Sequence, residues 1–528
     1  MDPRLRIDPI VPRVPRNLRP SVALVLVAVL VIVVGIAGSL ASGQRASAAS
    51  RQDVILLAGE PTTLDPAAMG DAASAGITAQ LFESVTALDP ALEVRPALAR
   101  DWELLDGGSR VVFHLRNGLR FSDGSPLTAD DVVRSWLRIV DPDHPSPLAS
   151  LMLDVQGAAE RSRGEIESSE VGLRAEGSDV EVRLTRPVPD FPAVVAGPSF
   201  GVVHSTSEGA AAFEAGQLVS SGAYRLVARS GDAIELGANE NYWAGTPAIP
   251  TVRLLTDLGG TSAVAAFEEG DIDYAAISSF DAAWIAYDAA LGPHLRDVPS
   301  LSVEYYGFDT SRPPFDDPKV RQAFGAAVDW RRVVQLASPD DAIPATSIVP
   351  EGIPERTDRD FLPAHDPDAA RRLLTDAGFP GGKGFPDVAV VTSGTAYDDA
   401  LLSEIREVLG ITLRHETMDF GPYFERLTSD PPAIWSLVWV ADYPGQNDFL
   451  GVLLGEGQTN NYGRWKSADF EAAIQAGDYE TAQEIVGREV PVVPIAYGRG
   501  WALSRDGLLG ATQNGLGIVR LAGLAWAG

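Results

Sequence analysis

The sequence predicts an α/β protein with more than one structural domain. Its 528 residues exceed what a single hydrophobic core usually organises. Beyond residue 50, strand-like and helix-like segments alternate without an internal repeat, which is the pattern of helices layered on a mostly parallel sheet. A hydrophobic content of 45% and a charged content of 22% are typical of a soluble globular chain.

The first 50 residues form a targeting segment. Five arginines precede an unbroken apolar run from Val22 to Val34, which extends with small residues to Ala41 and is followed by Ala46-Ser47-Ala48. A basic region, an apolar core and a small-residue cleavage site predict a secretory signal peptide. The run is also about 20 residues long, which suits an uncleaved membrane anchor. Both alternatives place the body of the protein outside the cytoplasm.

Three helices can be placed from their capping residues. In PLTADDVVRSWLRIV, Thr128 is the expected N-cap, acidic residues fill the first turn, and apolar residues follow at helical spacing. In DDPKVRQAFGAAVDW, Asp317 precedes a proline at the first helical position. The same logic starts a third helix at Asp366 and ends it at Gly378.

Two strand-helix-strand units predict parallel pairing, because such crossovers join neighbouring strands of a helix-covered sheet. In chain order, the first unit is Val252 to Leu255, Thr261 to Glu269 and Tyr274 to Ile277, and the second is Val388 to Thr392, Tyr397 to Leu409 and Ile411 to Glu416.

The segment 110–128 has a different character. It alternates apolar and polar residues and breaks at Asn117-Gly118 and Asp123-Gly124, which predicts hairpins. Residues 93–187 are therefore expected to form a β-rich insertion. Further along, IWSLVWVAD predicts a buried strand of a parallel sheet that ends on the carboxylate of Asp442, just before a Pro-Gly turn.

Several kinds of chemistry are absent or weakly indicated. There is no cysteine, which excludes disulfides and thiolate sites, and no P-loop motif, which excludes ATP use through such a loop. The six histidines are dispersed, so no metal site and no cofactor are expected. A formal net charge of -30 disfavours nucleic acid as a partner. GPSFG offers Ser199 as a hydrolase nucleophile, but the following residues do not read as a helix start.

Eight segments, in order along nearly the whole exported body, resemble the family 5 extracytoplasmic solute-binding proteins of ABC importers, the group of oligopeptide, dipeptide and nickel binders. They are GEPTTLDPA (59–67), LFESVTALDPALEVRPALARDWELLDGGSRVVFHLRNGLRFSDGSPLTADDVVRSW (81–136), SGAYRLV (221–227), NENYWAG (239–245), FEEGDIDYA (267–275), PFDDPKVRQAFGAAVDW (314–330), RRLLTDAGFP (371–380) and VPVVPIAYGRG (490–500).

The resemblance implies a periplasmic-binding-protein-like two-lobe clamshell with an additional β-rich domain. The expected parts are residues 1–50 as signal peptide or anchor, 51–92 and 188–302 as lobe I, 93–187 as the inserted domain, 303–491 as lobe II, and 492–528 as a return to lobe I. It implies a non-enzymatic, monomeric receptor at the periplasmic or cell-surface side. Such a receptor delivers peptides to a membrane permease with a separate ATPase. The alternatives are another small solute, such as a metal chelate or oligosaccharide, and a secreted serine hydrolase.

The resemblance also implies binding residues. In peptide-binding members an aspartate in the matching W-x-x-D segment, here Trp439 to Asp442, pairs with the ligand's α-ammonium group, and the tryptophan lines the cleft. Tyr305 is a further candidate for the cleft wall. Some members have an arginine three residues before that tryptophan for the peptide carboxylate. This chain has Ser436 there, and Arg426, which matches another cationic position of the family, is a weaker candidate for that contact.

Overall fold

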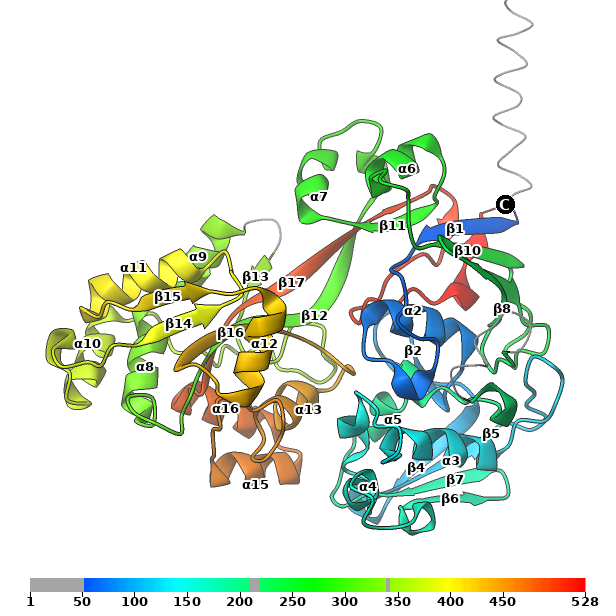
Figure 1. The fold of residues 1–528 in the computed structure, drawn as a ribbon, viewed down its shortest axis with the longest axis horizontal. Coiled ribbons are helices and arrows are strands. Elements are labelled where there is room, and N and C mark those ends of the chain that lie inside the picture. The colour runs from blue at the N-terminus through cyan, green and yellow to red at the C-terminus, as the bar shows by residue number, and fades with distance from the viewer. Residues whose placement is uncertain (1–51, 209–217, 339–341, 528) are drawn as a thin grey trace, which may run out of the picture. The chain divides into compact units, whose positions relative to one another are not determined.

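The computed structural model describes residues 52–208, 218–338 and 342–527, and residues 53–527 form one unit (Figure 1). Among these described residues no helix is long and apolar enough to cross a bilayer. The predicted signal or anchor, Val22 to Ala41, lies outside the described residues.

A mixed sheet of 11 strands organises most of the chain, in the order β15-β14-β16-β12-β17-β11-β1-β10-β9-β8, with β13 also paired to β17. Lobe II contributes β13 (Ala342–Pro344), β14 (Ala389–Thr392), β15 (Arg414–Thr417) and β16 (Ile434–Val440). Lobe I contributes β1 (Asp53–Leu57), β8 (Tyr224–Ser230), β9 (Ala233–Ala238), β10 (Thr251–Leu255) and β11 (Tyr274–Ile277). The long strands β12 (Leu295–Phe308) and β17 (Val492–Ser504) pair with strands of both lobes and so connect them.

The helices of lobe II cover both faces of its part of the sheet. They are α8 (Pro318–Ala327), α9 (Trp330–Ala337), α10 (Pro367–Asp376), α11 (Asp398–Leu409), α12 (Phe420–Ser429), α13 (Gln446–Phe449), α14 (Gly451–Leu454), α15 (Ala468–Ala476) and α16 (Tyr479–Glu489). Because side chains alternate along a strand, Tyr305 and Trp435 enter one core and Tyr306 and Ile434 the other. Lobe I carries α2 (Ala72–Leu81), α6 (Ala263–Glu269) and α7 (Ser279–Ile285).

A separate four-stranded antiparallel sheet lies within the predicted insertion. Its order is β4 (Ala99–Leu105), β5 (Arg110–Leu115), β7 (Asp179–Arg183) and β6 (Leu173–Glu176). The helices α3 (Ala129–Leu137), α4 (Ala158–Ser162) and α5 (Phe191–Val194) accompany it, and Trp136 of α3 packs edge-on against Phe113 of β5 and against Phe200. Two short pairs complete the strands: β2 (Thr86–Leu88) with β3 (Val94–Pro96), and β18 (Leu508–Leu509) with β19 (Ala525–Trp526).

The helix starts predicted from the sequence are confirmed. Thr128 caps α3 in a reciprocal capping box with Asp131. Asp317 caps α8 and Asp366 caps α10, each with a side-chain oxygen that accepts a backbone N–H of the first turn. The strands of both predicted units run parallel, as expected. β14 pairs directly with β15, whereas β10 and β11 are not neighbours, because β1 lies between them and pairs with both.

Two local predictions are wrong. Asn117-Gly118 does not join a hairpin, because β5 is already paired with β4 on one edge and β7 on the other, and only an isolated bridge from Arg120 to Pro126 follows. The strand before Asp442 is buried only at its start, and its sheet is mixed. Beyond Ser436 the exposure alternates, and Val438 and Val440 are 52% and 54% exposed.

Candidate functional site

The outer edge of β16 is open where the strand approaches Asp442. On one side β16 pairs with β12 along its full length, but on the other side β14 pairs only with Ile434 and Trp435. The Tyr423 hydroxyl occupies this outer edge at Ser436, where it bonds both the backbone N–H and the carbonyl of that residue. Because backbone groups two residues apart point the same way along a strand, the amides of Val438 and Val440 face this edge too. Among the described residues, no strand pairs with this side of β16 beyond Trp435.

Two aspartates meet at the end of this strand. Asp442 follows β16 directly, and Asp448 comes from the short helix α13. The Asp448 Oδ2 atom accepts hydrogen bonds from the Trp439 indole Nε1 at 3.0 Å and from the Asp442 backbone N–H at 3.2 Å. Asp448 is fully buried, and its other oxygen has no partner. The turn therefore holds Trp439, Asp442 and Asp448 as one group.

Without a bound cation, the surroundings of these two carboxyl groups disfavour their ionised forms. Burial raises the pKa of Asp442 to about 6. Burial, and then the neighbouring charge of Asp442, raise the pKa of Asp448 well above its usual range. Within the described part of the chain, neither aspartate forms an ion pair with an arginine, lysine or histidine. No cationic side chain of the described residues therefore compensates the charge that these two carboxyl groups carry when ionised.

A third carboxylate, Asp190, approaches from the segment that follows the predicted insertion. Asp190 stands at the N-terminal end of α5 without a side-chain capping bond, its Oδ1 atom accepts from the Tyr479 hydroxyl at 3.3 Å, and its Oδ2 atom is buried without a partner. A Cβ atom at Gly445 would lie 2.6 Å from that Oδ2 atom, so the turn after Asp442 packs against Asp190 only because residue 445 is a glycine. Burial raises the pKa of Asp190, against the opposing charge of Arg186.

A cavity of about 210 Å³ adjoins the exposed part of β16 and is lined by Val438, Glu304 and Tyr397 among others. Glu304 is the cross-strand partner of Val438. Burial raises the pKa of Glu304, and the charge of Asp398 adds to this rise. Asp398 in turn accepts a 2.6 Å hydrogen bond from the Tyr306 hydroxyl. Side chains that enter this cavity meet acidic groups.

The other residues predicted from the sequence are placed differently. Tyr305 is fully buried, packs edge-on against Trp435 at 5.5 Å, and its hydroxyl has no partner. It is not brought to the open edge of β16. Arg426 lies on α12, is partly exposed, and forms an ion pair with Glu416 at 3.2 Å. Its role toward a ligand carboxylate stays a prediction.

The hydrolase motif does not form a nucleophile. Ser199 is 3% exposed and sits in a short 3₁₀ turn, Pro198–Phe200, rather than between a strand and a helix. No histidine in the described part of the chain hydrogen-bonds to it. Asp448 was not predicted from the sequence. It stands six positions after Asp442, and no motif or spacing marks it.

Two lobes that share long strands, an inserted antiparallel sheet and a polar site at strand ends define a two-lobe solute-binding protein. The model for bacterial extracellular solute-binding proteins, family 5 middle, matches residues 93–461, and the chain belongs to this family of non-catalytic binding proteins.

Three relatives show the breadth of the family. The probable deoxycholate-binding periplasmic protein of Escherichia coli is 30% identical over 465 residues, covering 83% of this chain and 86% of that protein. The structure of the E. coli murein tripeptide binding protein has a TM-score of 0.72 at 22% identity, covering 90% and 99% of the two chains. That of the Haemophilus influenzae oligopeptide-binding protein in complex with RPPGFSPFR has a TM-score of 0.70 at 22% identity, covering 91% and 99%.

Proposed function

We propose that this protein is an extracytoplasmic receptor that captures peptides by their free amino terminus and delivers them to an ABC-type importer. The observation that carries the proposal is the pair formed by the half-buried Asp442 and the fully buried Asp448, which has no cation of its own among the described residues. A peptide α-ammonium group supplies that charge. A charge-assisted hydrogen bond in such a poorly hydrated place contributes about 1.5 to 3 kcal/mol.

The open edge of β16 supports a peptide rather than a simple amine. An extended ligand backbone that pairs with Val438 and Val440 continues the sheet in place of β14, and its amine end lies next to Asp442. Ligand side chains on one face then point toward the cavity beside Glu304. This acidic cavity favours neutral or basic side chains over acidic ones.

The relatives are named for different ligands, and the charge of the site discriminates between those ligands. A bile-acid anion, the ligand in the name of the E. coli relative, carries a carboxylate. Placing it beside Asp442 and Asp448 adds a negative charge next to two carboxyl groups for which burial already disfavours ionisation, which is unfavourable. Peptides, named for the H. influenzae and murein-binding structures, bring the opposite charge at their amino end. The charge of the site therefore supports peptides.

The working cycle follows from this assignment. Residues 303–491 act as lobe II and residues 51–92, 188–302 and 492–528 as lobe I, and the two close on the ligand by a hinge motion through the shared strands β12 and β17. The receptor acts as a monomer outside the cytoplasm. Hydrolysis of ATP is left to a separate subunit, since the chain has no P-loop.

The test begins with native mass spectrometry of whatever co-purifies with the protein. Calorimetry then compares the identified peptide with its N-acetylated form. Acetylation is expected to weaken binding by about 2 to 5 kcal/mol, the scale for leaving a buried charge unpaired. Equal affinity for the two forms would exclude Asp442 as the amine partner. Tight binding of deoxycholate with no binding of peptides would exclude the peptide function itself.

The carboxylate end is tested separately. Free-acid and C-terminally amidated versions of the same peptide are compared on the wild type and on Arg426→Ala. If Arg426 leaves Glu416 to meet the ligand carboxylate, the wild type prefers the free acid by about tenfold and the variant shows no preference.

A further inference from the structure

The cavity beside the exposed part of β16 lies over one cross-strand row of the sheet. Ala496 of β17 is the direct partner of Glu304 of β12, and Glu304 is the direct partner of Val438 of β16. All three residues line the cavity, because directly opposed residues of paired strands project to the same face. The next place in this row, beyond Val438, holds no strand in the described part of the chain.

Glu304 supplies the charge of this cavity. It is the one acidic or basic side chain among the described residues that line it. Glu304 is half-buried, and burial raises its pKa, against the hydrogen bond from Thr395. The nearby Asp398 is already bonded to His415 Nε2 at 3.1 Å, whereas no arginine, lysine or histidine of the described residues forms an ion pair with Glu304. A cation that enters the cavity therefore meets a carboxyl group without a counter-charge of its own.

The geometry of the row favours a long side chain. Neighbouring strands lie about 4.8 Å apart, so a ligand residue that pairs with Val438 stands about 10 Å from Glu304. A lysine or arginine side chain reaches roughly 6 to 7 Å from its Cα atom and a glutamate side chain about 4 Å, so their charged ends meet over Val438. The cavity of about 210 Å³ has room for either cationic side chain, since about 150 Å³ holds a benzene molecule.

The amine partner sets the direction of the ligand. A peptide that begins at Asp442 and extends back along β16 runs antiparallel to that strand. If its first residue is level with Val440 or Ala441, its third or fourth residue is level with Val438. The residues on either side of that one project to the opposite face. The cavity therefore takes the side chain of one ligand residue and not those of its neighbours.

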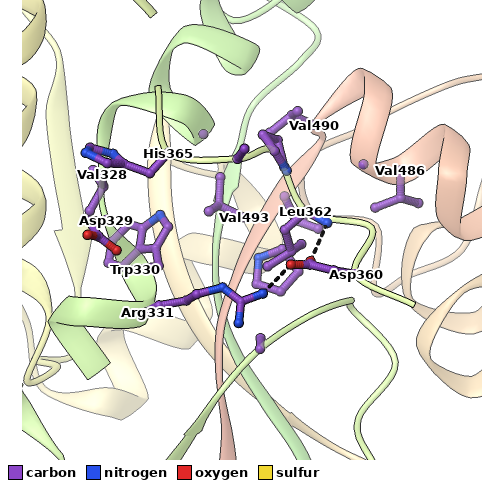
Figure 2. Close-up of a pocket in the computed structure, with 17 residues that line it drawn as sticks. Val328, Asp329, Trp330, Arg331, Asp360, Leu362, His365, Val486, Val490 and Val493 are labelled. Atoms are coloured by element: carbon purple, nitrogen blue, oxygen red, sulfur yellow. Dashed lines mark hydrogen bonds and ion pairs between the residues drawn. The ribbon is translucent and has the colours of Figure 1, made fainter. Parts of the chain in front are cut away.

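The cavity at the junction of α8 and α9, which also has a volume of about 210 Å³, offers no such place (Figure 2). None of the described residues that line it belongs to β16, and its arginine, Arg331, pairs with Asp360. The acidic cavity that borders the edge of β16 is thus the one that contains Glu304.

We propose that Glu304 makes this receptor selective for peptides with lysine or arginine as the third or fourth residue, whose cationic side chain crosses Val438 to pair with the Glu304 carboxylate. This inference rests on the proposed function, because it needs a peptide held at Asp442. An acidic side chain in the same place is disfavoured by like charge, and a neutral one gains only the contact with Val438.

A set of pentaalanine peptides with a free amine tests the proposal, in which the second, third or fourth alanine is replaced by lysine or by norleucine. Norleucine is lysine without its ammonium group. Calorimetry at neutral pH gives the Kd of each peptide. The wild type is expected to bind the lysine peptide about tenfold more tightly than the norleucine peptide at the third or the fourth position, and the two equally at the adjacent position.

Two variants assign the preference to its residue. Glu304→Gln keeps the size of the side chain and removes its charge, so it should bind the lysine and norleucine peptides equally, with circular dichroism reporting that it is folded. Glu407→Gln is the matched control, because Glu407 is an exposed glutamate of α11 in the same lobe and does not line the cavity. It should keep the tenfold preference.

The outcomes separate this inference from the proposed function. The inference is overturned if the wild type binds lysine and norleucine peptides equally at all three positions, or if Glu304→Gln keeps the preference. Norleucine peptides that still bind, and that lose affinity on N-acetylation, would then leave the peptide function intact. If none of the pentapeptides binds the wild type at millimolar concentration, the proposed function fails and this inference fails with it.

Discussion

Replacing Asp442 by asparagine keeps the shape of the side chain and removes its charge. Burial raises the pKa of Asp442 from 3.8 to about 6, a difference worth about 3 kcal/mol. This is the penalty for ionising the carboxyl group in the empty site, and a bound ammonium group offsets it. We expect Asp442→Asn to weaken the binding of a peptide with a free amine by roughly 30- to 5000-fold, which corresponds to about 2 to 5 kcal/mol.

The pH dependence of wild-type binding follows from the same pKa. Above pH about 6 the Asp442 carboxylate is ionised and meets the ammonium group directly. Below that pH a proton has to leave before the ligand enters, so the Kd rises about tenfold for each further unit. In Asp442→Asn this proton is absent, and the Kd depends less on pH.

Isothermal titration calorimetry between about pH 4.5 and 7.5 measures both effects, over a range in which a peptide amine of pKa about 8 stays protonated. Asp430→Asn is the control, because Asp430 is an exposed carboxylate of the same lobe whose side chain is 76% accessible. It should leave the Kd unchanged. A wild-type Kd that stays constant over this range, or an Asp442→Asn variant with wild-type affinity, would refute the reasoning.

Three further predictions concern the same region. Without ligand, Asp442→Asn should stabilise the folded protein at neutral pH by up to about 3 kcal/mol and have no effect below pH about 4. The reason is that a carboxyl group with a raised folded-state pKa destabilises the folded protein only at a pH where it ionises. Thermal unfolding at the two pH values checks this. Asp448→Ala should weaken peptide binding about tenfold by leaving the Trp439 indole and the Asp442 N–H without an acceptor, while Asp448→Asn should lose less, as calorimetry can show. Tyr305→Phe should leave the Kd unchanged and the stability equal or higher, because the Tyr305 hydroxyl is buried without a partner; a weaker Kd would return Tyr305 to the site.

Local rules were sufficient where the deciding interaction is local. The caps at Thr128, Asp317 and Asp366 are formed by a side chain and a backbone N–H two or three residues away, so the helix starts could be read from the sequence. Asn117-Gly118 forms a turn, as the sequence predicts, but it does not form the predicted hairpin. Whether a strand follows the turn and pairs with β5 depends on which edges of β5 are free. β4 directly precedes β5 and occupies one edge, and β7, from much later in the chain, occupies the other.

The residues of the candidate site also fall into those that the sequence predicts and those that it does not. Trp439 and Asp442 are recognisable through the resemblance, as a W-x-x-D segment at the end of β16. Asp448 is not, because neither its bond to the Asp442 N–H nor the close packing of its turn on Asp190, more than 250 positions away, has a signal in the sequence. The burial of Tyr305 likewise depends on which side of β12 the helices of lobe II cover.

The sequence by itself determined the α/β layering, because that rests on periodicity and capping along single stretches of chain, and it carried the resemblance to the family through eight segments, which is what marked the W-x-x-D segment. Only the tertiary structure decided that β14 stops short and leaves the edge of β16 without a strand partner beyond Trp435, and that the turn holding Asp442 and Asp448 packs on Asp190. Both are matters of contact, or missing contact, between segments distant in sequence, and burial there sets the charge and hydrogen-bonding demands of the site.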